Sequence, residues 1–506
     1  MNILFITADQ WRGECLSALD HCQVKTPHLD ALASEGVLFK NHYAQALECA
    51  PSRTSMHTGM YLQNHRCVTN GAPVDSRFTN WALEVRAAGY DPSLFGYTDT
   101  AADPRGLDPD DPRLSHYSEP LPGIGDFTPI FENASLDWAN NLRDKGYSIP
   151  ESLKSLYGIK AEGTDWAQGG ESPLPLAIKA EDDEAHFMVD NCMEWINRQE
   201  KPWITHLSLL RPHPPFVAPE PYNRLYDPAA MAEPSRCENP DQEAMQHPLL
   251  DFYINHNRKF RAPDSIRQSQ QDKASYYGLM SQVDDNLGRL FAHLKAGGHW
   301  HSTLIIFTSD HGEQLGDHWL MNKLGYFDQS YHIPLIIRDP RNQADASRGT
   351  QIEGFTENVD LMPSMLDWLG IDVPSQCDGF SLLPAIHTGA MPPGWRQQAH
   401  WECDFRNVRD DTVEKHLGIT LHQCGLAVIR DHCYKYVHFS ALPPLFFDLK
   451  QDPGEFINQA ENPEYHPLVL EYSQKILTWK MNHAERGLTE TILGEGGAVT
   501  RRAALR

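Results

Sequence analysis

Residues 49–53, with the sequence Cys-Ala-Pro-Ser-Arg, place a thiol and a guanidinium about one helical turn apart. Pro51 suits the first turn of a helix and residues 54–60 can continue it, so Cys49 is expected at a helix N-terminus. That end favours an anion, and its field is expected to lower the pKa of the thiol. Arg53 lies on the same helical face. The stretch predicts a nucleophile beside a cation, although a lone cysteine is more often a small buried hydrophobe.

Two other stretches place candidate metal ligands at the ends of apolar segments. Residues 2–8 lead into Asp9, and residues 304–309 lead into Asp310 and His311. Both segments predict buried parallel strands, and ligands bind at the carboxyl ends of such strands. The three side chains therefore form a candidate site for one divalent ion, Mn²⁺, Zn²⁺ or Ca²⁺. Taken singly, Asp310 could cap a helix or turn and His311 could be a surface histidine.

The elements that must position these side chains alternate along the first part of the chain. We expect strands at 2–8, 37–44, 91–97, 203–209, 303–309 and 333–338, and helices at 26–36, 81–88, 181–198, 271–295 and 361–369. This alternation predicts an α/β fold with a doubly wound, mostly parallel sheet. Segments 101–175 and 219–263 show little periodicity and are expected to shape a binding site or wrap the surface.

The pattern changes near residues 389–394. From there we expect antiparallel strands at 400–406, 425–430, 434–440 and 445–449, followed by a long helix at 467–484. We therefore divide the chain into a catalytic domain, 1–390, and a smaller α+β subdomain, 391–506. Residues 487–506 show no core partner, so they are either a frayed tail or a segment that reaches over a neighbouring subunit.

Composition narrows the class of partner. The chain has 506 residues and a net charge of −25, from 43 basic and 68 acidic residues. This acidity argues against nucleic acid and against binding to anionic membranes through a basic patch. It permits an anionic substrate, because a metal ion and local cations set the field in a pocket. A chain of this length also needs more than one core.

The chain shows neither a secretion signal nor an apolar run long enough to span a bilayer. Its ten cysteines are scattered without CxxC pairs, so they indicate neither a zinc ribbon nor a disulfide framework. We therefore expect a cytoplasmic protein with reduced thiols.

Taken together, the motifs resemble the sulfatase family of the alkaline phosphatase superfamily. Cys-x-Pro-Ser-Arg followed by Thr58-Gly59 resembles the sulfatase signature. The stretches most similar to the phosphonate monoester hydrolase and arylsulfatase branch are 9–12, 49–66, 211–216, 308–323 and 434–449. The resemblance covers most of the chain. It implies an alkaline-phosphatase-like fold, with a large, mixed and mostly parallel sheet flanked by helices and a smaller α+β C-terminal subdomain.

The resemblance also implies a metal-dependent hydrolase of sulfate monoesters, phosphonate monoesters and phosphodiesters. Cys49 would be converted to formylglycine by a formylglycine-generating enzyme, and one hydroxyl of the aldehyde hydrate would attack sulfur or phosphorus. Loss of the second hydroxyl proton would later expel the product anion. The metal ligands would be Asp9, Cys49 as formylglycine, Asp310 and His311. The pair Gln10 and His311 resembles the phosphonate hydrolase and choline-sulfatase branches and favours Mn²⁺ over Ca²⁺.

Other roles follow from the same resemblance. Arg53 would hold the aldehyde hydrate or bridge to the metal ligands, His213 would bind a substrate oxygen or protonate the leaving group, and Lys323 would neutralise transferred charge. The candidate substrate-binding residues are Gln10, Asn70 and Tyr97. Asp99 stands where phosphonate hydrolases commonly have a threonine, and would disfavour doubly charged phosphate monoesters or recruit a cationic substrate. Each residue also has a simpler interpretation: a surface ion pair for Arg53, packing among prolines for His213, a solvated side chain for Lys323, and a place in the core or a turn for Asn70 and Tyr97.

Several alternatives remain open. The protein could be a narrow-specificity sulfatase, such as a choline-sulfatase-like enzyme, or a non-catalytic sulfatase-like binding protein with unmodified Cys49. Peptide mass analysis at Cys49 distinguishes an enzyme with modified Cys49 from a binding protein with unmodified Cys49. A phosphatase with a thiolate nucleophile is a weaker rival. We expect a homodimer or homotetramer to which the C-terminal segment contributes.

Overall fold

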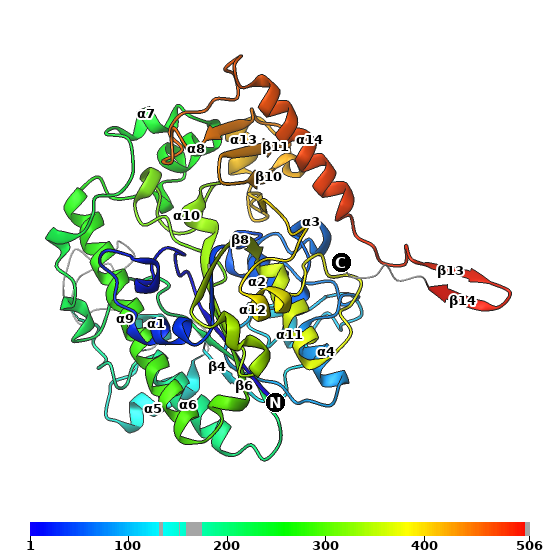
Figure 1. Cartoon of the computed structure of the whole chain (residues 1–506). Helices are drawn as coiled ribbons and strands as arrows, with labels where there is room; N and C mark the ends of the chain where they lie inside the picture. The colour runs from blue at the N-terminus through cyan, green and yellow to red at the C-terminus, as the bar shows by residue number, and fades with distance from the viewer. Residues whose placement is uncertain (131–134, 151, 158–174, 501–506) are drawn as a thin grey trace.

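The computed structural model describes residues 1–130, 135–150, 152–157 and 175–500. Its centre is an eight-stranded sheet with the strand order β4-β3-β5-β1-β6-β7-β2-β8 (Figure 1). The strands are β1 (Asn2–Ala8), β2 (Val37–Tyr43), β3 (Ser93–Gly96), β4 (Phe127–Pro129), β5 (Ile204–Leu209), β6 (Thr303–Thr308), β7 (His332–Arg338) and β8 (Thr350–Glu357). Among these strands β7 runs against both neighbours, and the other pairings are parallel. The expected mixed, mostly parallel sheet is confirmed.

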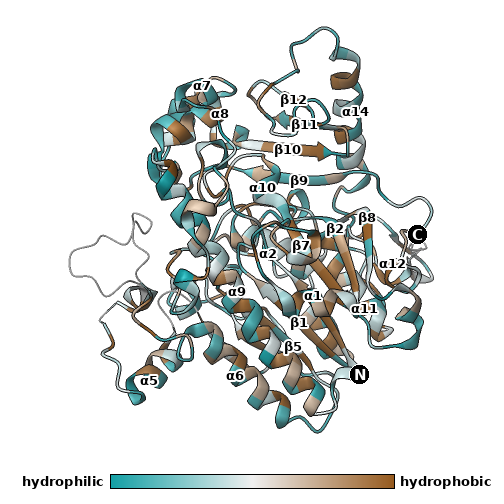
Figure 2. Cartoon of the chain, turned by 60° about the vertical axis from the view of Figure 1, so that its left-hand side comes forward, coloured by the Kyte–Doolittle hydropathy of each residue, from teal (hydrophilic) through white to brown (hydrophobic). Residues whose placement is uncertain are grey.

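Helices cover both faces of the sheet, and β1, β5 and β6 are therefore buried along their whole length. One face packs on α1 (Pro27–Ser34), α6 (Glu184–Asn197) and α9 (Ile266–Ala296). The other packs on α2 (Cys49–Thr58), α4 (Trp81–Ala87), α11 (Leu361–Leu369) and α12 (Leu383–Thr388). Figure 2 shows the hydrophobic strands between these two layers. Successive side chains of β1 point to opposite faces of the sheet, so the strand contributes to the hydrophobic core on each face. Leu4 packs in the core beside α1, α6 and α9, and Phe5 packs in the other.

The register of the central strands brings their carboxyl ends together. Thr7 of β1 lies opposite Thr308 of β6 on one side and Ser208 of β5 on the other. The residues that follow these three strands therefore leave the sheet at one edge. Residue Cys49 reaches the same edge, because β2 is parallel to them and ends shortly before it.

A second, antiparallel sheet has the order β12-β11-β10-β9. Its strands are β9 (Ala399–Asp404), β10 (Gly425–Arg430), β11 (Tyr434–Phe439) and β12 (Leu445–Asp448), and α14 (His466–Asn482) packs against β10 and β11. The expected small C-terminal α+β unit is confirmed, whereas the domain boundary at residue 390 stays a prediction. Beyond α14, β13 (Thr491–Gly494) and β14 (Gly497–Thr500) form a hairpin that points away from the body (Figure 1).

Several elements were missing from the sequence-based prediction. Strand β8 escaped because it lies at the sheet edge and its first half is largely exposed. The segments expected to be irregular contain β4, α5 (Leu136–Asp144), α7 (Pro240–Ala244), α8 (Pro248–Asp251) and a π-helix, Phe252–His256. Parts of the first segment (131–134, 151 and 158–174) lie outside the described residues. The remaining short helices are α3 (Leu62–His65), α10 (Asp328–Tyr331) and α13 (Thr412–Leu417). In the part of the chain described here, helices with the length and apolar character of a membrane span do not occur.

Candidate active site

Four candidate metal ligands meet beyond the carboxyl ends of β1 and β6. Asp9 follows β1, Asp310 and His311 follow β6, and Cys49 is the first residue of α2. All four side chains are buried, and one ligand atom from each lies within 4.8 Å of the others. His311 Nε2 is 3.3 Å from Cys49 Sγ and 3.6 Å from Asp9 Oδ1. The structure thus brings together all the residues that the sequence proposed as metal ligands.

The donor set fits a divalent cation. Asp9 Oδ1 is buried and has no hydrogen-bond partner within the described part of the chain, so it is an oxygen ligand ready for use. The Nδ1–H of His311 donates to the Gly312 carbonyl at 3.1 Å, which leaves Nε2 as the acceptor facing the cluster. Burial lowers the pKa of His311 to about 4, so its imidazole is neutral at pH 7 and able to bind a metal.

Arg53 fixes both carboxylates with one guanidinium. Its Nε donates to Asp310 Oδ2 at 2.9 Å and its Nη2 donates to Asp9 Oδ2 at 3.2 Å. Nη1 donates to Ser208 Oγ at 2.8 Å and to the Tyr97 carbonyl at 3.1 Å. The side chain is fully buried, so it has no freedom to reorient. Arg53 therefore meets the metal ligands, which was one of its two expected placements.

Electrostatics keep Asp9 ionised. Burial alone would raise the pKa of Asp9, but His213, His311, Lys323 and Arg53 together lower it below the usual range, the histidines only when they are protonated. A carboxylate held in this way can bind a cation across the physiological pH range.

Lys323 and Gln10 complete the wall beside Cys49. The Lys323 Nζ donates to Gln10 Oε1 at 3.0 Å and to Cys49 Sγ at 3.3 Å. Burial opposes the charge of Lys323, yet the nearby Cys49 and carboxylates raise its pKa, so it stays a cation. Gln10 has a left-handed φ of 67°, and its Nε2 donates to Glu313. Gln10 thus holds the lysine in place.

The expected lowering of the Cys49 thiol pKa is wrong. Burial raises this pKa well above its ordinary value, and Asp9, Asp310 and Asp99 raise it further, whereas Lys323 lowers it. The prediction rested on the helix N-terminus alone, because the carboxylates near Cys49 are distant from it in the sequence. The alternative of a thiolate nucleophile loses its support here.

Tyr97 and Asn70 occupy different places. The Tyr97 hydroxyl donates to Asp9 Oδ2, and its ring centroid lies 4.2 Å from the Arg53 guanidinium carbon. Asn70 Oδ1 instead accepts the Ala50 N–H at 2.9 Å, so it secures the first turn of α2 behind Cys49. Tyr97 therefore contacts the ligand cluster directly, and Asn70 is one step removed from it.

His213 lies in the loop after β5. Its Nδ1–H donates to the Pro214 carbonyl at 2.7 Å, which leaves Nε2 as the other functional nitrogen. When protonated, it is one of the groups that lower the pKa of Asp9, which places it at the same edge of the sheet. The structure thus gathers it with the metal candidates.

Two supporting residues were not identified from the sequence as site residues. Ser208 binds Arg53, as described above. Glu313 accepts the N–H groups of Leu315 and Asn322 at 2.7 Å each and so shapes the loop that leads to Lys323. Their only sequence signal is position, since Ser208 lies one residue before the end of β5 and Glu313 follows the candidate ligands. Such positions predict proximity but not a partner.

Asp99 is the third carboxylate near Arg53. Its Oδ2 lies 3.8 Å from Arg53 Nε, and it is buried with a left-handed φ of 51°. Burial raises the pKa of Asp99 to about 7; Arg53 opposes this rise, and the charges of Asp9 and Asp310 add to it. This carboxyl is therefore partly charged near neutral pH.

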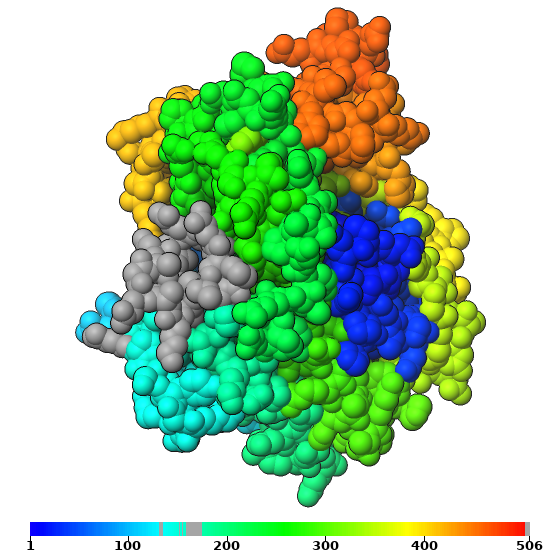
Figure 3. All heavy atoms as spheres, turned by 90° about the vertical axis from the view of Figure 1, so that its left-hand side faces the viewer, coloured from blue at the N-terminus to red at the C-terminus, as the bar shows by residue number. Residues whose placement is uncertain are grey.

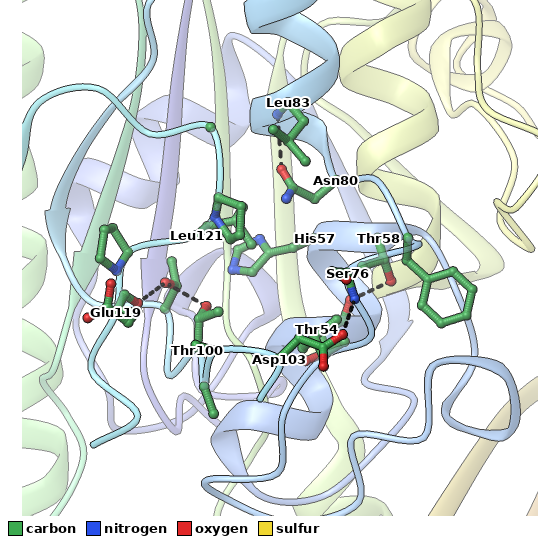
Figure 4. Close-up of a pocket in the computed structure, with 18 of the residues that line it drawn as sticks. Thr54, His57, Thr58, Ser76, Asn80, Leu83, Thr100, Asp103, Glu119 and Leu121 are labelled. Atoms are coloured by element: carbon green, nitrogen blue, oxygen red, sulfur yellow. Dashed lines mark hydrogen bonds between the residues drawn. The ribbon is translucent and has the colours of Figure 1, made fainter. Parts of the chain in front are cut away.

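A separate pocket of about 370 Å³ lies beside α2, away from Cys49 (Figure 4). Thr54, His57 and Thr58 of α2 line it together with Thr98 and Thr100, which flank Asp99. His57 accepts a hydrogen bond from Trp81 Nε1 at 3.1 Å. The lining includes neither the candidate metal ligands nor Lys323, so we keep this pocket apart from the candidate active site.

Comparison with known proteins gives matches over nearly the whole chain. The family model described as Sulfatase matches residues 1–371, and that of the C-terminal region of N-sulphoglucosamine sulphohydrolase matches residues 316–482. The multifunctional alkaline phosphatase superfamily protein PehA of Trinickia caryophylli is 42% identical over 99% of this chain and 99% of its own. An arylsulfatase of Clostridium perfringens is 27% identical over 97% of this chain and 96% of its own. The crystal structure of the phosphonate monoester hydrolase of Agrobacterium radiobacter matches with a TM-score of 0.94 at 42% identity, covering 99% of this chain and 100% of that one.

Proposed function

Because the chain belongs to the sulfatase family of the alkaline phosphatase superfamily, we propose that it is a metal-dependent hydrolase of sulfate monoesters, phosphonate monoesters and phosphodiesters. The family implies a divalent metal and a formylglycine made from the signature cysteine. One observation carries the proposal: Arg53 holds two carboxylates, while a lysine and a histidine both reach Cys49 Sγ. A protein that only bound a ligand would not need cations and metal ligands directed at a single atom.

The roles of the residues follow from this geometry. We assign the metal to Asp9, Asp310, His311 and the group made from Cys49. When bound, the metal would supply the positive charge that activates the nucleophile and polarises the ester. Formylglycine would supply a hydrated aldehyde, with one hydroxyl for attack and a second for product release. The imidazole and two carboxylates suit Mn²⁺ or Zn²⁺, and we favour Mn²⁺.

The remaining side chains act on the substrate or on these ligands. Arg53 orients the two carboxylates, and Lys323 stabilises charge on the transferred group beside Cys49. His213 binds a substrate oxygen or protonates the leaving group. Gln10 positions Lys323. We assign the other two predicted substrate-binding residues, Tyr97 and Asn70, to positioning Asp9 and the first turn of α2.

Asp99 points to the charge of the preferred substrate. Arg53 already pairs with Asp9 and Asp310, so the partly charged Asp99 adds negative charge that Arg53 does not fully compensate. A dianionic phosphate monoester carries more charge than a sulfate or phosphonate monoester and is repelled more strongly. We therefore propose that the site selects singly charged esters.

The test compares three matched aryl esters. We expect kcat/KM for the sulfate and the phosphonate monoester to exceed that for the phosphate monoester by about 10-fold or more, equivalent to roughly 1.4 kcal/mol. The protein is produced beside a formylglycine-generating enzyme, and peptide mass analysis measures the modified fraction at Cys49. A higher sulfate value favours a sulfatase, and a higher phosphonate value favours a phosphonate hydrolase. Absence of any rate that depends on Cys49 would contradict the proposal.

Asp99→Asn serves as the diagnostic variant, because it removes the charge and keeps the size. We expect it to raise the phosphate monoester rate relative to the sulfate rate by about 10-fold. Asp103→Asn is the matched control, since Asp103 lies on the same segment and pairs with Arg105. An unchanged ratio in Asp99→Asn would refute the charge argument. It would not contradict the proposed hydrolase activity, which the rates on the three esters test separately.

We also propose a cytoplasmic location. All ten cysteines are free thiols, which suits a reducing compartment. A fraction found only outside the cytoplasm after cell fractionation would overturn this assignment.

We propose that the chain forms a homodimer or homotetramer through its C-terminal segment. The β13–β14 hairpin exposes Ile492, Leu493 and Val499, and α14 exposes Leu477 and Met481. Apolar side chains on a projecting hairpin suggest contact with a second copy. We expect light scattering to give the mass of two or four chains, and truncation after residue 486 to lower it. The mass of a single chain at micromolar concentration would refute this assembly.

A further inference from the structure

A second cluster of ligand-type side chains lies far along the chain from the catalytic residues. Asp251 ends α8, His256 ends the π-helix, and His416 lies on α13. The Nε2 atoms of His256 and His416 lie 3.4 Å and 3.6 Å from the same oxygen, Asp251 Oδ2. The two imidazole centroids are 3.8 Å apart. Three donors from two parts of the chain thus converge on one point.

These distances suit a shared metal ion better than hydrogen bonds. Nitrogen–oxygen hydrogen bonds have a usual range of about 2.7–3.2 Å. Zinc binds histidine nitrogen and carboxylate oxygen at about 2.0–2.2 Å, so donors on a tetrahedron around it stand roughly 3.3–3.5 Å apart. The separations of His256 and His416 from Asp251 lie at or next to that range.

Local structure orients the carboxylate and the first histidine. Asn255 Nδ2 donates to Asp251 Oδ1 at 2.9 Å, which turns Oδ2 toward the imidazoles. In an α-helix, side chains five residues apart would point about 140° away from each other. The π-helical turn, closed by the Asn257 N–H on the Phe252 carbonyl at 2.7 Å, lets Asp251 and His256 share a side. Such turns are frequent at functional sites.

We propose that Asp251, His256 and His416 form a second metal site, which takes Zn²⁺ or a similar late first-row divalent cation. Imidazole ligands favour these metals over Mg²⁺ or Ca²⁺. Water would complete the coordination, because the side chains of His256 and His416 are 49% and 27% exposed. The ion would connect residues 248–257 to α13 in the C-terminal subdomain. In Figure 3 the green surface around residue 250 adjoins the yellow-orange surface around residue 415. Its role is structural, since it includes none of the catalytic candidates.

A third group with ligand-type side chains, His28, Asp284 and Asp285, is a weaker candidate. Asp284 already accepts the N–H groups of His28 and Leu29 at 3.0 Å and 2.8 Å, so it caps α1. Its carboxylate is therefore in use, whereas Asp251 Oδ2 is directed at the two histidines.

The experiment isolates the second site in the full-length chain. Asp310→Asn disables the proposed catalytic site, and equilibrium dialysis against micromolar Zn²⁺ then measures the remaining binding. We expect one equivalent of Zn²⁺ per chain, and loss of that equivalent when His256→Gln and His416→Gln are added. In the Asp310→Asn chain, Zn²⁺ is expected to raise the melting temperature by roughly 2–4 °C, and addition of the two histidine substitutions should abolish this shift.

Two controls keep the result interpretable. The double variant should retain native aryl-ester turnover, because neither histidine belongs to the catalytic site, and this shows that it folds. Visible bands of Co²⁺ in place of Zn²⁺ report the coordination geometry directly. Equal Zn²⁺ binding with and without the two histidines would overturn the proposal, and so would the absence of any binding in Asp310→Asn.

Discussion

Replacing Cys49 with alanine is expected to lower kcat/KM for aryl sulfates and phosphonates by ~10⁴-fold or more. Alanine cannot become formylglycine, so the variant lacks the attacking group, while Lys323 and the metal ligands remain in place. The thiol itself cannot substitute, because burial and nearby carboxylates raise its pKa. Steady-state rates, normalised to the formylglycine content of the parent protein, provide the measurement.

Cys49→Ser distinguishes loss of attack from loss of release. Serine keeps one hydroxyl but lacks the second hydroxyl that a hydrated aldehyde offers for product release. We expect it to liberate about one equivalent of aryl alcohol and then to stop. Sustained turnover at the parent rate in either variant would exclude Cys49 as the source of the nucleophile.

Asp310→Asn is expected to remove the metal and to lower kcat/KM by ~10³-fold. The amide keeps the shape of the side chain but loses the charge that pairs with the metal. It also removes one of the two carboxylates that Arg53 joins, at 2.9 Å from Nε to Oδ2. Elemental analysis of the purified variant should show one metal equivalent per chain fewer than the parent protein contains.

A matched buried aspartate tests whether the effect is specific. Asp339 follows β7, which runs antiparallel, so it leaves the sheet at the opposite edge and pairs with Arg341 at 2.7 Å. Asp339→Asn should therefore keep its metal and its turnover. If both variants lost metal equally, general destabilisation would explain the result and the ligand assignment would fail.

The sequence was sufficient for the elements that carry the ligands. Strands β1 and β6 are apolar along their length, and each ends directly before a candidate ligand. Because parallel strands share an edge, Asp9 and Asp310 could be placed together without a structure. Helix α2 was predicted from Pro51 and the residues 54–60 that could continue it, and it runs from Cys49 to Thr58.

The contacts that join those elements could not be predicted in the same way. Arg53 reaches Ser208 on β5 and Tyr97 directly after β3, and neither residue carries a local signal of that pairing. The same limit explains the wrong prediction for the thiol pKa, since burial raises this pKa and the charges of Asp9 and Asp310 raise it further. Strand β8 was missed because an exposed edge weakens the apolar pattern.

The burial of Cys49 bears on when the proposed modification could take place. In the folded chain Cys49 is 5% exposed, and Ser52 and Arg53 are fully buried. A modifying enzyme could not reach this stretch once the sheet has formed. The proposed conversion of the thiol must therefore precede the completion of folding. We then expect the yield of active protein to depend on the relative rates of folding and of modification.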